Sequence, residues 1–378
     1  MSQLELDPNL PQIDDLLSIF LNDAPLLDVR APVEFAEGAF PLAKNHPLIT
    51  DNERHNIGIK YKEEGQDAAI ALGAQFMDET TRAERVSHWQ TFAEQHPAGI
   101  LYCFRGGMRS KISQQWLFDQ TGTRYPRVNG GYKALRRFLL DQLAENAQLM
   151  HPVILGGRTG VGKTVLLNKL TPSLDLEGIA WHRGSAFGKH ATPQPTQISF
   201  ENALSIELLK LVHQGNPYFV SEDESRNIGI RHMPAEFYEP FSKAPIVVLE
   251  ASIDERIAIT EQEYVGEALA EFQALYGDEK GYDEWEKSIH DNLDRIQKRL
   301  GGERYREQKT LLESATQEHR KHGKSHLYQD WIRVLLVDYY DSMYGYQLEK
   351  KKDRIVFSGN ATAAREYLAT EHQIVQKD

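Results

Sequence analysis

Two short stretches of this 378-residue sequence carry residue types that can act on anionic substrates. The first runs from Cys103, the only cysteine, to Ser110, and contains a Gly-Gly pair and two arginines. The apolar run 98–102 predicts a buried strand before it, and apolar residues at helical spacing in 111–118 predict a helix after it. A thiol at such a strand-to-helix turn meets unpaired amides and the positive end of a helix dipole, which favour the reactive thiolate.

A buried structural cysteine is the alternative interpretation, because free cysteine is among the most buried residue types. The glycines let the loop curl until its amides point inward, and the arginines add fixed positive charge, so we interpret Cys103 as a nucleophile. The residues expected to bind an anion beside it are Arg105, Gly106, Gly107, Met108, Arg109 and Ser110.

The second stretch is a complete Walker A pattern between a predicted strand at 152–156 and a predicted helix at 165–170. Its glycines allow successive N–H groups to cradle phosphate oxygens. Lys163 can neutralise the outer phosphate, and the Thr164 hydroxyl can hold Mg²⁺. The expected phosphate-binding residues are Gly157, Arg158, Thr159, Gly160, Val161, Gly162, Lys163 and Thr164.

A predicted strand at 217–221 ends in a run of carboxylates, of which Glu222 and Asp223 occupy the Walker B position. Either could reach a metal ion or act as a base. Three acids in four residues also suit a solvated turn, and both interpretations remain open.

Composition limits the class of protein. Charged residues make up 26% and hydrophobic ones 40%, as is usual for soluble globular chains. The acidic segment Met1–Asp14 lacks the apolar core of a signal peptide, and no run approaches 18 uninterrupted apolar residues, so we expect neither secretion nor a membrane span. A single cysteine excludes an internal disulfide and fits a reducing cytoplasm.

The net charge of −12 argues weakly against nucleic-acid binding, but the charge is unevenly distributed. Between Phe104 and Leu140 the only acid is Asp119, whereas lysines and arginines are frequent. A basic region around the proposed nucleophile predicts contacts with a nucleic-acid backbone. The residues expected to make them are Lys111, Arg124, Arg127, Lys133, Arg136 and Arg137.

Strand and helix patterns alternate down to Leu140, which predicts an α/β domain over residues 1–140. Its strand at 25–30 ends in Asp28 and Arg30, at the sheet edge where open α/β folds place ligands, so we expect these two to support the site. Residues 45–73 are expected to be loops with a short helix, and 141–150 a linker. Residues 141–378 are predicted to form a P-loop NTPase-like α/β domain with a helical insertion at roughly 254–330.

Three motifs of the first domain resemble a rhodanese domain: 27–30 followed by Glu34-Phe35, Cys103 with Arg109-Ser110, and 128–132. The segment 38–45 follows the family's Gly-His-Ile-Pro-Gly-Ala run only loosely. Five residues separate Cys103 from Arg109, one more than in sulfur-transferring members and the same as in rhodanese-like cysteine phosphatases. A roomier loop suits a phosphate-sized group.

A rhodanese-like cysteine loop fused to a P-loop domain resembles one family over nearly the whole chain, bacterial tRNA 2-selenouridine synthase, which the run 222–229 also matches. The resemblance implies replacement of sulfur by selenium in 2-thiouridine at the tRNA wobble position. Selenophosphate would be the selenium donor, and the thio group would first be geranylated from geranyl diphosphate. Cys103 falls on the catalytic cysteine, implying a selanyl-cysteine intermediate. ATP is not required, and an enzyme that supplies selenophosphate is an expected partner.

The main rival is an ATP-dependent kinase fused to a sulfurtransferase or cysteine phosphatase. Such a phosphatase usually has His before its cysteine, where this chain has Tyr102. A non-enzymatic rival is a nucleotide-gated tRNA-binding module with an idle rhodanese domain. The presence of Cys103, Arg105 and Arg109 argues against an inactive rhodanese domain.

Overall fold

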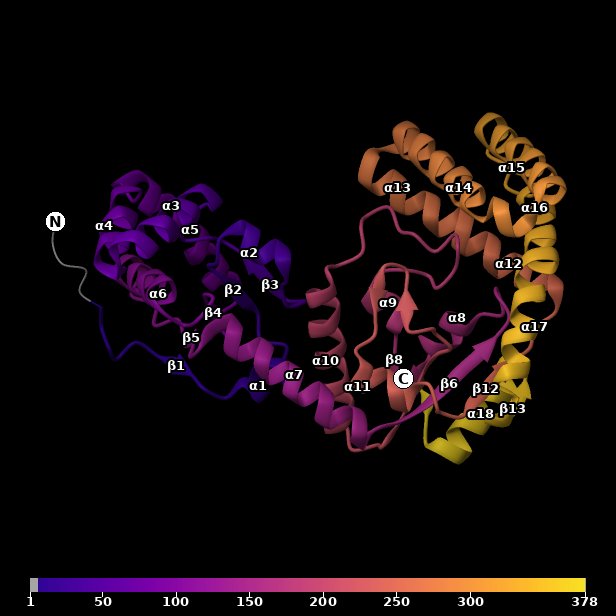
Figure 1. Ribbon diagram of the computed structural model, residues 1–378, viewed down its shortest axis with the longest axis horizontal. Coiled ribbons are helices and arrows are strands. Elements are labelled where there is room, and N and C mark those ends of the chain that lie inside the picture. The colour runs from indigo at the N-terminus through magenta and orange to yellow at the C-terminus, as the bar shows by residue number, and fades with distance from the viewer. Residues whose placement is uncertain (1–5, 378) are drawn as a thin grey trace. The chain divides into compact units, whose positions relative to one another are not determined.

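The computed structural model describes residues 6–377, so the first five residues of the acidic segment Met1–Asp14 lie outside the described residues (Figure 1). The chain divides into two compact units. The first comprises Met1–Glu145 and Thr196–Lys210, and the second comprises Asn146–Pro195 and Leu211–Asp378. The observed division differs from the predicted boundary at residue 140 in two respects: the first unit continues to Glu145, and a segment from the later sequence also belongs to it.

A five-stranded parallel sheet in the order β1-β5-β4-β2-β3 forms the centre of the first unit. Its central strands are short and wholly apolar or buried, as expected for a parallel sheet covered on both faces. The predicted strands at 25–30 and 98–102 are confirmed in shorter form. The bounds are β1 (Gln12–Ile13), β2 (Leu26–Asp28), β3 (Ala43–Asn45), β4 (Ile100–Tyr102) and β5 (Arg127–Val128).

Two sequence predictions for this unit are wrong. Residues 45–73, expected to be loops with a short helix, hold helices α3 and α4. Helix α3 begins with a capping box between Thr50 and Glu53. It buries no residue, so its sequence lacks the apolar periodicity that would have predicted a helix. The expected linker 141–150 continues α7, because Leu139, Leu143 and Ala147 repeat at helical spacing and are buried. The helices are α1 (Leu16–Leu21), α2 (Pro32–Glu37), α3 (Asp51–Glu64), α4 (Gln66–Gln75), α5 (Glu79–Gln95), α6 (Met108–Thr121) and α7 (Gly131–Leu149).

Helix α10 (Gln197–His213) supplies the later segment of the first unit. Its Ile206 and Leu209 pack in one apolar cluster with Leu135 and Leu139 of α7. The hydroxyl of Ser205 also donates to the Leu139 carbonyl at 2.6 Å. These apolar and polar contacts make α10 part of the core of this unit.

The second unit contains another five-stranded parallel sheet, in the order β13-β12-β6-β9-β8. The Walker A strand β6 lies at its centre, and the register pairs Leu155 with Glu222 on β9. The predicted strands at 152–156 and 217–221 are confirmed. The bounds are β6 (His151–Gly157), β8 (Ser173–Leu174), β9 (Tyr218–Glu222), β12 (Ile246–Leu249) and β13 (Ile355–Gly359), with two short antiparallel pairs, β7 (Leu170–Thr171) with β14 (Val375–Gln376) and β10 (Asn227–Ile228) with β11 (Arg231–His232).

Helices in the second half of this unit have a core of their own, in which Trp285, Leu293 and Trp331 are fully buried. Helical structure begins at Ile253, close to the predicted start at residue 254, and extends with interruptions past residue 330 to Lys350. Two stretches, η1 and η2, are π-helices, a form that often occurs at functional sites. The bounds are α8 (Lys163–Leu167), α9 (Leu176–Ala180), α11 (Ala235–Phe241), α12 (Ile253–Glu261), η1 (Gln262–Glu267), α13 (Ala268–Tyr276), α14 (Asp278–Leu300), α15 (Gly302–His322), α16 (Tyr328–Val334), η2 (Leu335–Tyr340), α17 (Asp341–Lys350), η3 (Lys352–Arg354) and α18 (Ala361–His372). Within residues 6–377, no helix combines the length and the apolar character that crossing a bilayer requires.

Candidate active sites

Cys103 directly follows β4, at the carboxyl edge of the first sheet, and only 2% of it is exposed. Its thiol donates to the Ser110 hydroxyl, with Sγ and Oγ 3.2 Å apart, and that hydroxyl donates to the Gly107 carbonyl at 3.0 Å. Arg105 and Gly107 of the same loop are exposed. The thiol therefore lies beneath a loop with exposed residues and also packs in the apolar core, as the alternative interpretation expects; its role as a nucleophile stays a prediction.

The start of α7 fixes the cysteine loop from behind. The Tyr132 amide donates to the Cys103 carbonyl at 2.8 Å, and the Lys133 amide donates to the Phe104 carbonyl at 3.0 Å. Gly106 has a φ of +65°, and a Cβ there would lie 2.6 Å from the Gly130 nitrogen. Only glycine permits this approach of two backbones, so the loop and the turn before α7 form one unit.

Arg109 reaches across this loop to a carboxylate from α2. Its Nη1 lies 2.5 Å from Glu34 Oε2 and its Nη2 lies 3.0 Å from Oε1. Burial alone would lower the pKa of Arg109, but the hydrogen bonds and charge of Glu34 outweigh it and raise that pKa. Burial would raise the pKa of Glu34, and Arg109 reverses this, so that pKa is lowered. The sequence identified Glu34 only as part of the rhodanese motif, not as the partner of Arg109.

The predicted supporting pair, Asp28 and Arg30, is a buried ion pair at 2.7 Å. Arg30 also donates to the Gly38 carbonyl at 2.8 Å, and its guanidinium lies 3.8 Å from the centre of the Tyr132 ring. Both side chains are almost fully buried, so they brace the sheet edge from inside and have no surface to offer a ligand.

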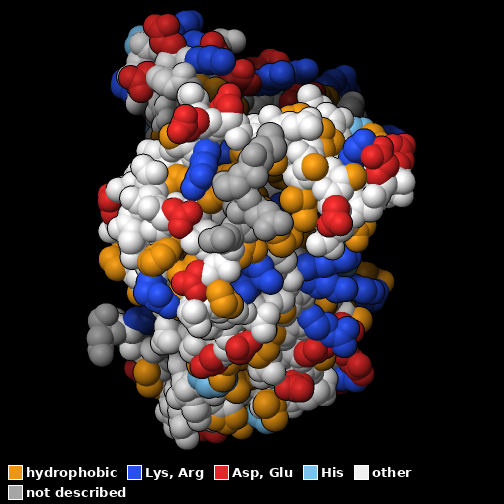
Figure 2. Space-filling view, turned by 90° about the vertical axis from the view of Figure 1, so that its left-hand side faces the viewer, with side chains coloured by type: hydrophobic (Ala, Val, Ile, Leu, Met, Phe, Trp, Pro, Cys, Tyr) orange, Lys and Arg blue, Asp and Glu red, His pale blue; other side chains and the backbone are white. Residues whose placement is uncertain are grey.

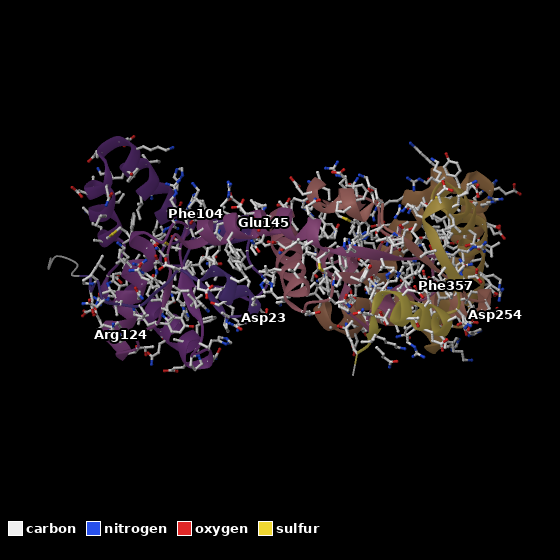
Figure 3. The ribbon with its side chains drawn as sticks, turned by 90° about the horizontal axis from the view of Figure 1, so that it is seen from below. Asp23, Phe104, Arg124, Glu145, Asp254 and Phe357 are labelled. Carbon is white, nitrogen blue, oxygen red and sulfur yellow. The ribbon has the colours of Figure 1, made fainter. Side chains whose placement is uncertain are left out.

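The six residues predicted to contact a nucleic-acid backbone divide into two groups. Arg127 is buried and donates to the Gly106 carbonyl at 3.2 Å, and Arg136 pairs with Glu201 and Asn202 of α10, so both have internal partners. Basic and acidic side chains intermix on the face drawn in Figure 2, with several Lys and Arg near its middle. Figure 3 labels Arg124, one of the six residues, and Phe104, the residue directly after Cys103. The exposed members are Lys111, Arg124, Lys133 and Arg137.

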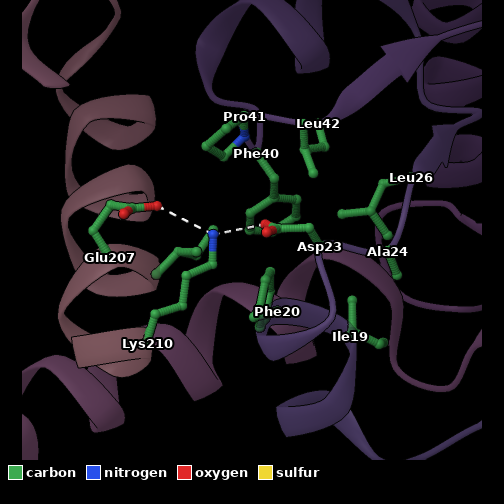
Figure 4. A pocket seen from close by; sticks show the side chains of 11 residues that line it. Ile19, Phe20, Asp23, Ala24, Leu26, Phe40, Pro41, Leu42, Glu207 and Lys210 are labelled. Atoms are coloured by element: carbon green, nitrogen blue, oxygen red, sulfur yellow. Dashed lines mark hydrogen bonds and ion pairs between the residues drawn. The ribbon is translucent and has the colours of Figure 1, made fainter. Parts of the chain in front are cut away.

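An apolar cavity of about 340 Å³ lies elsewhere in the first unit (Figure 4). Phe20, Phe40 and Ile206 are among its lining residues, and Leu26 places it at the amino end of β2, whereas Cys103 follows the carboxyl end of β4. Lys210 lies 2.7 Å from Asp23 and 3.2 Å from Glu207 there. The cavity therefore lies at the opposite edge of the sheet from the thiol.

In the second unit, the Walker A residues form the predicted loop between β6 and α8. Gly160 and Gly162 have φ values of +80° and +84°, which an amide cradle requires. The Lys163 ammonium donates to the Gly157 carbonyl at 3.1 Å, and Arg256 of α12 donates to the Thr159 carbonyl at 2.9 Å. These contacts tie the loop to its own first glycine and to α12.

The carboxylates near this loop differ from the predicted set. Asp223 pairs with Lys351 at 2.6 Å and is not free, whereas the carboxyl group of Glu222 is fully buried and has no hydrogen-bond partner among residues 6–377. Glu177 of α9, which the sequence analysis missed, lies 3.4 Å from the Thr164 hydroxyl. Glu224 lies close to Glu177, and only their distance in sequence hid this neighbourhood.

Burial and neighbouring carboxylates raise the pKa values of three glutamates near this loop. Burial, followed by repulsion from Asp175 and Glu177, raises the pKa of Glu222 well above its ordinary value. Burial and the charge of Glu177 raise the pKa of Glu224 in the same way. On η1, burial and Glu177 raise the pKa of Glu263 to about 7. Burial and like charges therefore favour the protonated forms of these three carboxyl groups.

These carboxylates have the donor chemistry that Mg²⁺ prefers. Among the described residues, however, no three acidic, His or Cys side chains converge closely enough to hold a metal ion. The Mg²⁺ predicted at Thr164 therefore stays a prediction, and no step of the reaction is assigned to it.

Comparison with known proteins shows which family contains this combination of sites. Residues 150–374 match the model of the tRNA 2-selenouridine synthase AAA domain. The tRNA 2-selenouridine synthase of Marinobacter nauticus is 48% identical over 94% of this chain and 97% of its own length. The chain belongs to the tRNA 2-selenouridine synthase family.

Other members of the family match to a similar extent. The synthases of Bordetella petrii and Pseudomonas putida (strain W619) are 48% and 47% identical, over 93% and 95% of this chain. The family model covers the Walker A loop and its carboxylates, and the relatives also match most of the first unit. The rhodanese resemblance of that unit stays a prediction.

Proposed function

We propose that this chain converts 2-thiouridine at the wobble position of tRNA into 2-selenouridine, with selenophosphate as the selenium donor. One observation carries the proposal: a chain of this family combines a thiol under an arginine-containing loop with a complete Walker A loop. The shared name of the relatives, tRNA 2-selenouridine synthase, supplies the substrate class and the product.

In the first step, the Walker A loop holds the diphosphate of geranyl diphosphate. The thiouridine sulfur attacks the allylic carbon, the carbon–oxygen bond breaks, and diphosphate leaves with the bonding electrons. The loop amides and Lys163 stabilise the charge that develops on the leaving group. S-alkylation also releases the N3 proton of the base, and the Glu177 carboxylate, next to the Thr164 hydroxyl, is available to accept it.

In the second step, selenophosphate binds at the Cys103 loop. The phosphate oxygens compete with Glu34 for the guanidinium of Arg109, since both are anions that suit its paired donors. The family resemblance implies that Cys103 then carries selenium as a selanyl-cysteine. Selenium is delivered to C2 of the uridine while geranyl thiolate departs.

Electron counting defines two routes at Cys103. If the thiolate attacks selenium, phosphorus leaves with the bonding pair as phosphite, and a thiol must later cleave the sulfur–selenium bond. If it attacks phosphorus, hydrogen selenide leaves to attack C2, and water releases phosphate from a phosphocysteine without any change of oxidation state. The seven-residue loop and the Ser110 hydroxyl 3.2 Å from Sγ suit the second route as well. Phosphorus-31 NMR of the products, with acid trapping of phosphocysteine, distinguishes them.

The Cys103→Ala variant tests the thiol. Incubated with thiolated tRNA, geranyl diphosphate and selenophosphate, it should accumulate S-geranyl-2-thiouridine and form no 2-selenouridine. Mass spectrometry of digested nucleosides measures both products. Undiminished 2-selenouridine would refute the assignment of Cys103.

The Lys163→Ala variant tests the Walker A loop. Geranylation should fall by at least about 100-fold, because the leaving diphosphate loses its fixed cation. Synthetic S-geranylated RNA should bypass the defect and still be converted to 2-selenouridine. Normal geranylation by this variant would disprove the role of the loop.

The kinase–sulfurtransferase alternative makes a different prediction for the unaltered chain. It requires ATP turnover, or phosphate release from a phosphomonoester, without any need for geranyl diphosphate. Nucleoside analysis with selenophosphate and geranyl diphosphate, each alone and then together, separates the two: our proposal expects 2-selenouridine only when both are present.

A further inference from the structure

Trp181, at the end of α9, has a backbone conformation that is rare for a bulky residue. Its φ and ψ are 53° and 54°, in the left-handed region. Such a conformation is unfavourable for any side chain with a Cβ and persists where surrounding contacts hold it, often at binding sites. The strain turns the chain sharply and presents the indole at the surface, 40% exposed.

The orientation of the indole is fixed by its neighbours. Its ring stacks on His190, with centroids 4.0 Å apart and planes 18° from parallel, and its Nε1 donates to the Thr192 hydroxyl at 2.8 Å. His190 in turn lies 2.9 Å from Glu271, which also pairs with Arg183. A large exposed ring held at its edge and backed by a second ring is a preformed stacking surface, unlike a freely rotating surface aromatic.

This stacking surface, formed by Trp181 and His190, belongs to the same unit as the Walker A loop. Helix α9 carries Glu177 four residues before Trp181, a distance of about 6 Å along a helix axis. Glu177 is the residue that lies beside the Thr164 hydroxyl. Next to His190, Lys189 is exposed and offers a cation to a phosphate.

We propose that Trp181, backed by His190, is the platform on which the unstacked wobble base of the tRNA lies, with Lys189 against the neighbouring phosphate. Sequence-specific RNA recognition targets unstacked loop bases and stacks them on aromatic side chains. The anticodon loop offers such bases, and α9 connects Trp181 to Glu177, which lies beside the Thr164 hydroxyl of the Walker A loop. The inference rests on the proposed function, because it takes tRNA as the substrate.

The test uses the full chain and a fluorescein-labelled, 2-thiolated anticodon stem-loop at one fixed salt concentration. Trp181→Gly removes the ring while glycine adopts the positive φ without strain, so the turn at the end of α9 should be retained. Affinity measured by fluorescence anisotropy should fall about 5- to 150-fold, the range expected when one stacked base is lost. Trp181→Phe keeps a stacking face and should recover most of the affinity. Tyr276→Ala, which removes an equally exposed ring on α13, should change nothing.

A stem-loop with an abasic wobble position identifies the base. Wild type should bind it as weakly as Trp181→Gly binds the intact RNA, and combining both changes should cause no further loss. Additive losses would show that another base is stacked and would overturn the inference. Unchanged affinity of Trp181→Gly, with wild type binding and selenating the RNA normally, would also overturn it while leaving the proposed function intact. No binding of any RNA by wild type would instead defeat the proposed function.

Discussion

Among single residues, the carboxylates around Lys163 are the ones whose surroundings change their chemistry most. Glu222, Glu224 and Glu263 all have pKa values raised by burial first and then by neighbouring carboxylates. A site that binds diphosphate would repel fully ionised carboxylates, so holding some of them protonated keeps the anion site usable. We therefore expect the protonation of these carboxyl groups to affect the stability of the second unit.

Glu263 permits a direct test of this effect. Its pKa of about 7 when folded exceeds its ordinary value of 4.5, so between these pH values the folded chain holds a proton that the unfolded chain has released. The resulting stabilisation is complete below pH 4.5 and is lost as the pH rises to about 7. Glu263→Gln should therefore become more stable relative to wild type by about 2 kcal/mol across this window, allowing for partial exposure. Urea unfolding at pH 5, 6, 7 and 8 measures the difference.

The free energy of unfolding of Glu263→Gln must be compared with that of wild type at each pH, because other groups change stability with pH in the opposite direction. Burial and nearby positive charge lower the pKa of His182 to about 4, so its contribution to stability grows as the pH rises from about 4 to 6.5. Glu239→Gln is a suitable control, because Lys243 lowers the pKa of this exposed carboxylate. Parallel stability curves for wild type and Glu263→Gln would contradict the charge-crowding account.

At the scale of elements, the position of the thiol depends on an interlocked loop and turn. The amides at the start of α7 hold the carbonyls of Cys103 and Phe104, and this contact requires glycine on both sides. At Gly131, which has a φ of +59°, a Cβ would overlap the carbonyl oxygen of Cys103. The cysteine loop and the motif at 128–132, which are separate in the sequence, thus form one interlocked unit.

Gly131→Ala should disrupt this interlocked unit. Backbone strain and the overlap with the Cys103 carbonyl together should cost more than about 2 kcal/mol and remove selenation activity. Gly107→Ala is the matched control, because a Cβ there meets open space and its φ is negative; it should change stability by less than about 0.5 kcal/mol. Differential scanning calorimetry and nucleoside analysis measure the two effects. Equal melting temperatures for both variants would argue against the interlocked arrangement.

At the scale of the whole molecule, α10 follows the second sheet's early strands in sequence yet contributes to the core of the first unit. Leu209 is fully buried there, among Leu135, Leu139 and Tyr132. The first unit therefore requires a segment from beyond residue 195 to complete its apolar core. Its stability depends on folding of the chain on both sides of the second unit's first strand.

Leu209→Ala tests this dependence. Removing a fully buried leucine should cost about 2–5 kcal/mol, and the loss should appear in the first unit. Hydrogen exchange measured by mass spectrometry should show faster exchange in peptides covering β4 and β5. Val153→Ala, in the core of β6, is the converse control and should affect the second unit. Faster exchange of β6 alone in Leu209→Ala would contradict the assignment of α10.

The order of strand, glycine-containing loop and helix at Cys103 and Lys163 is encoded in neighbouring residues, so the sequence by itself determined both loops and most of the strands. The partners of these loops come from distant positions: Glu34 lies 75 residues from Arg109, and Lys351 lies 128 residues from Asp223. Local spacing contains no information on such pairs, because only the packing of sheets and helices brings them together. Tertiary structure alone decided that Glu177, and not Asp223, lies beside the Walker A threonine, and that α10 completes the first core.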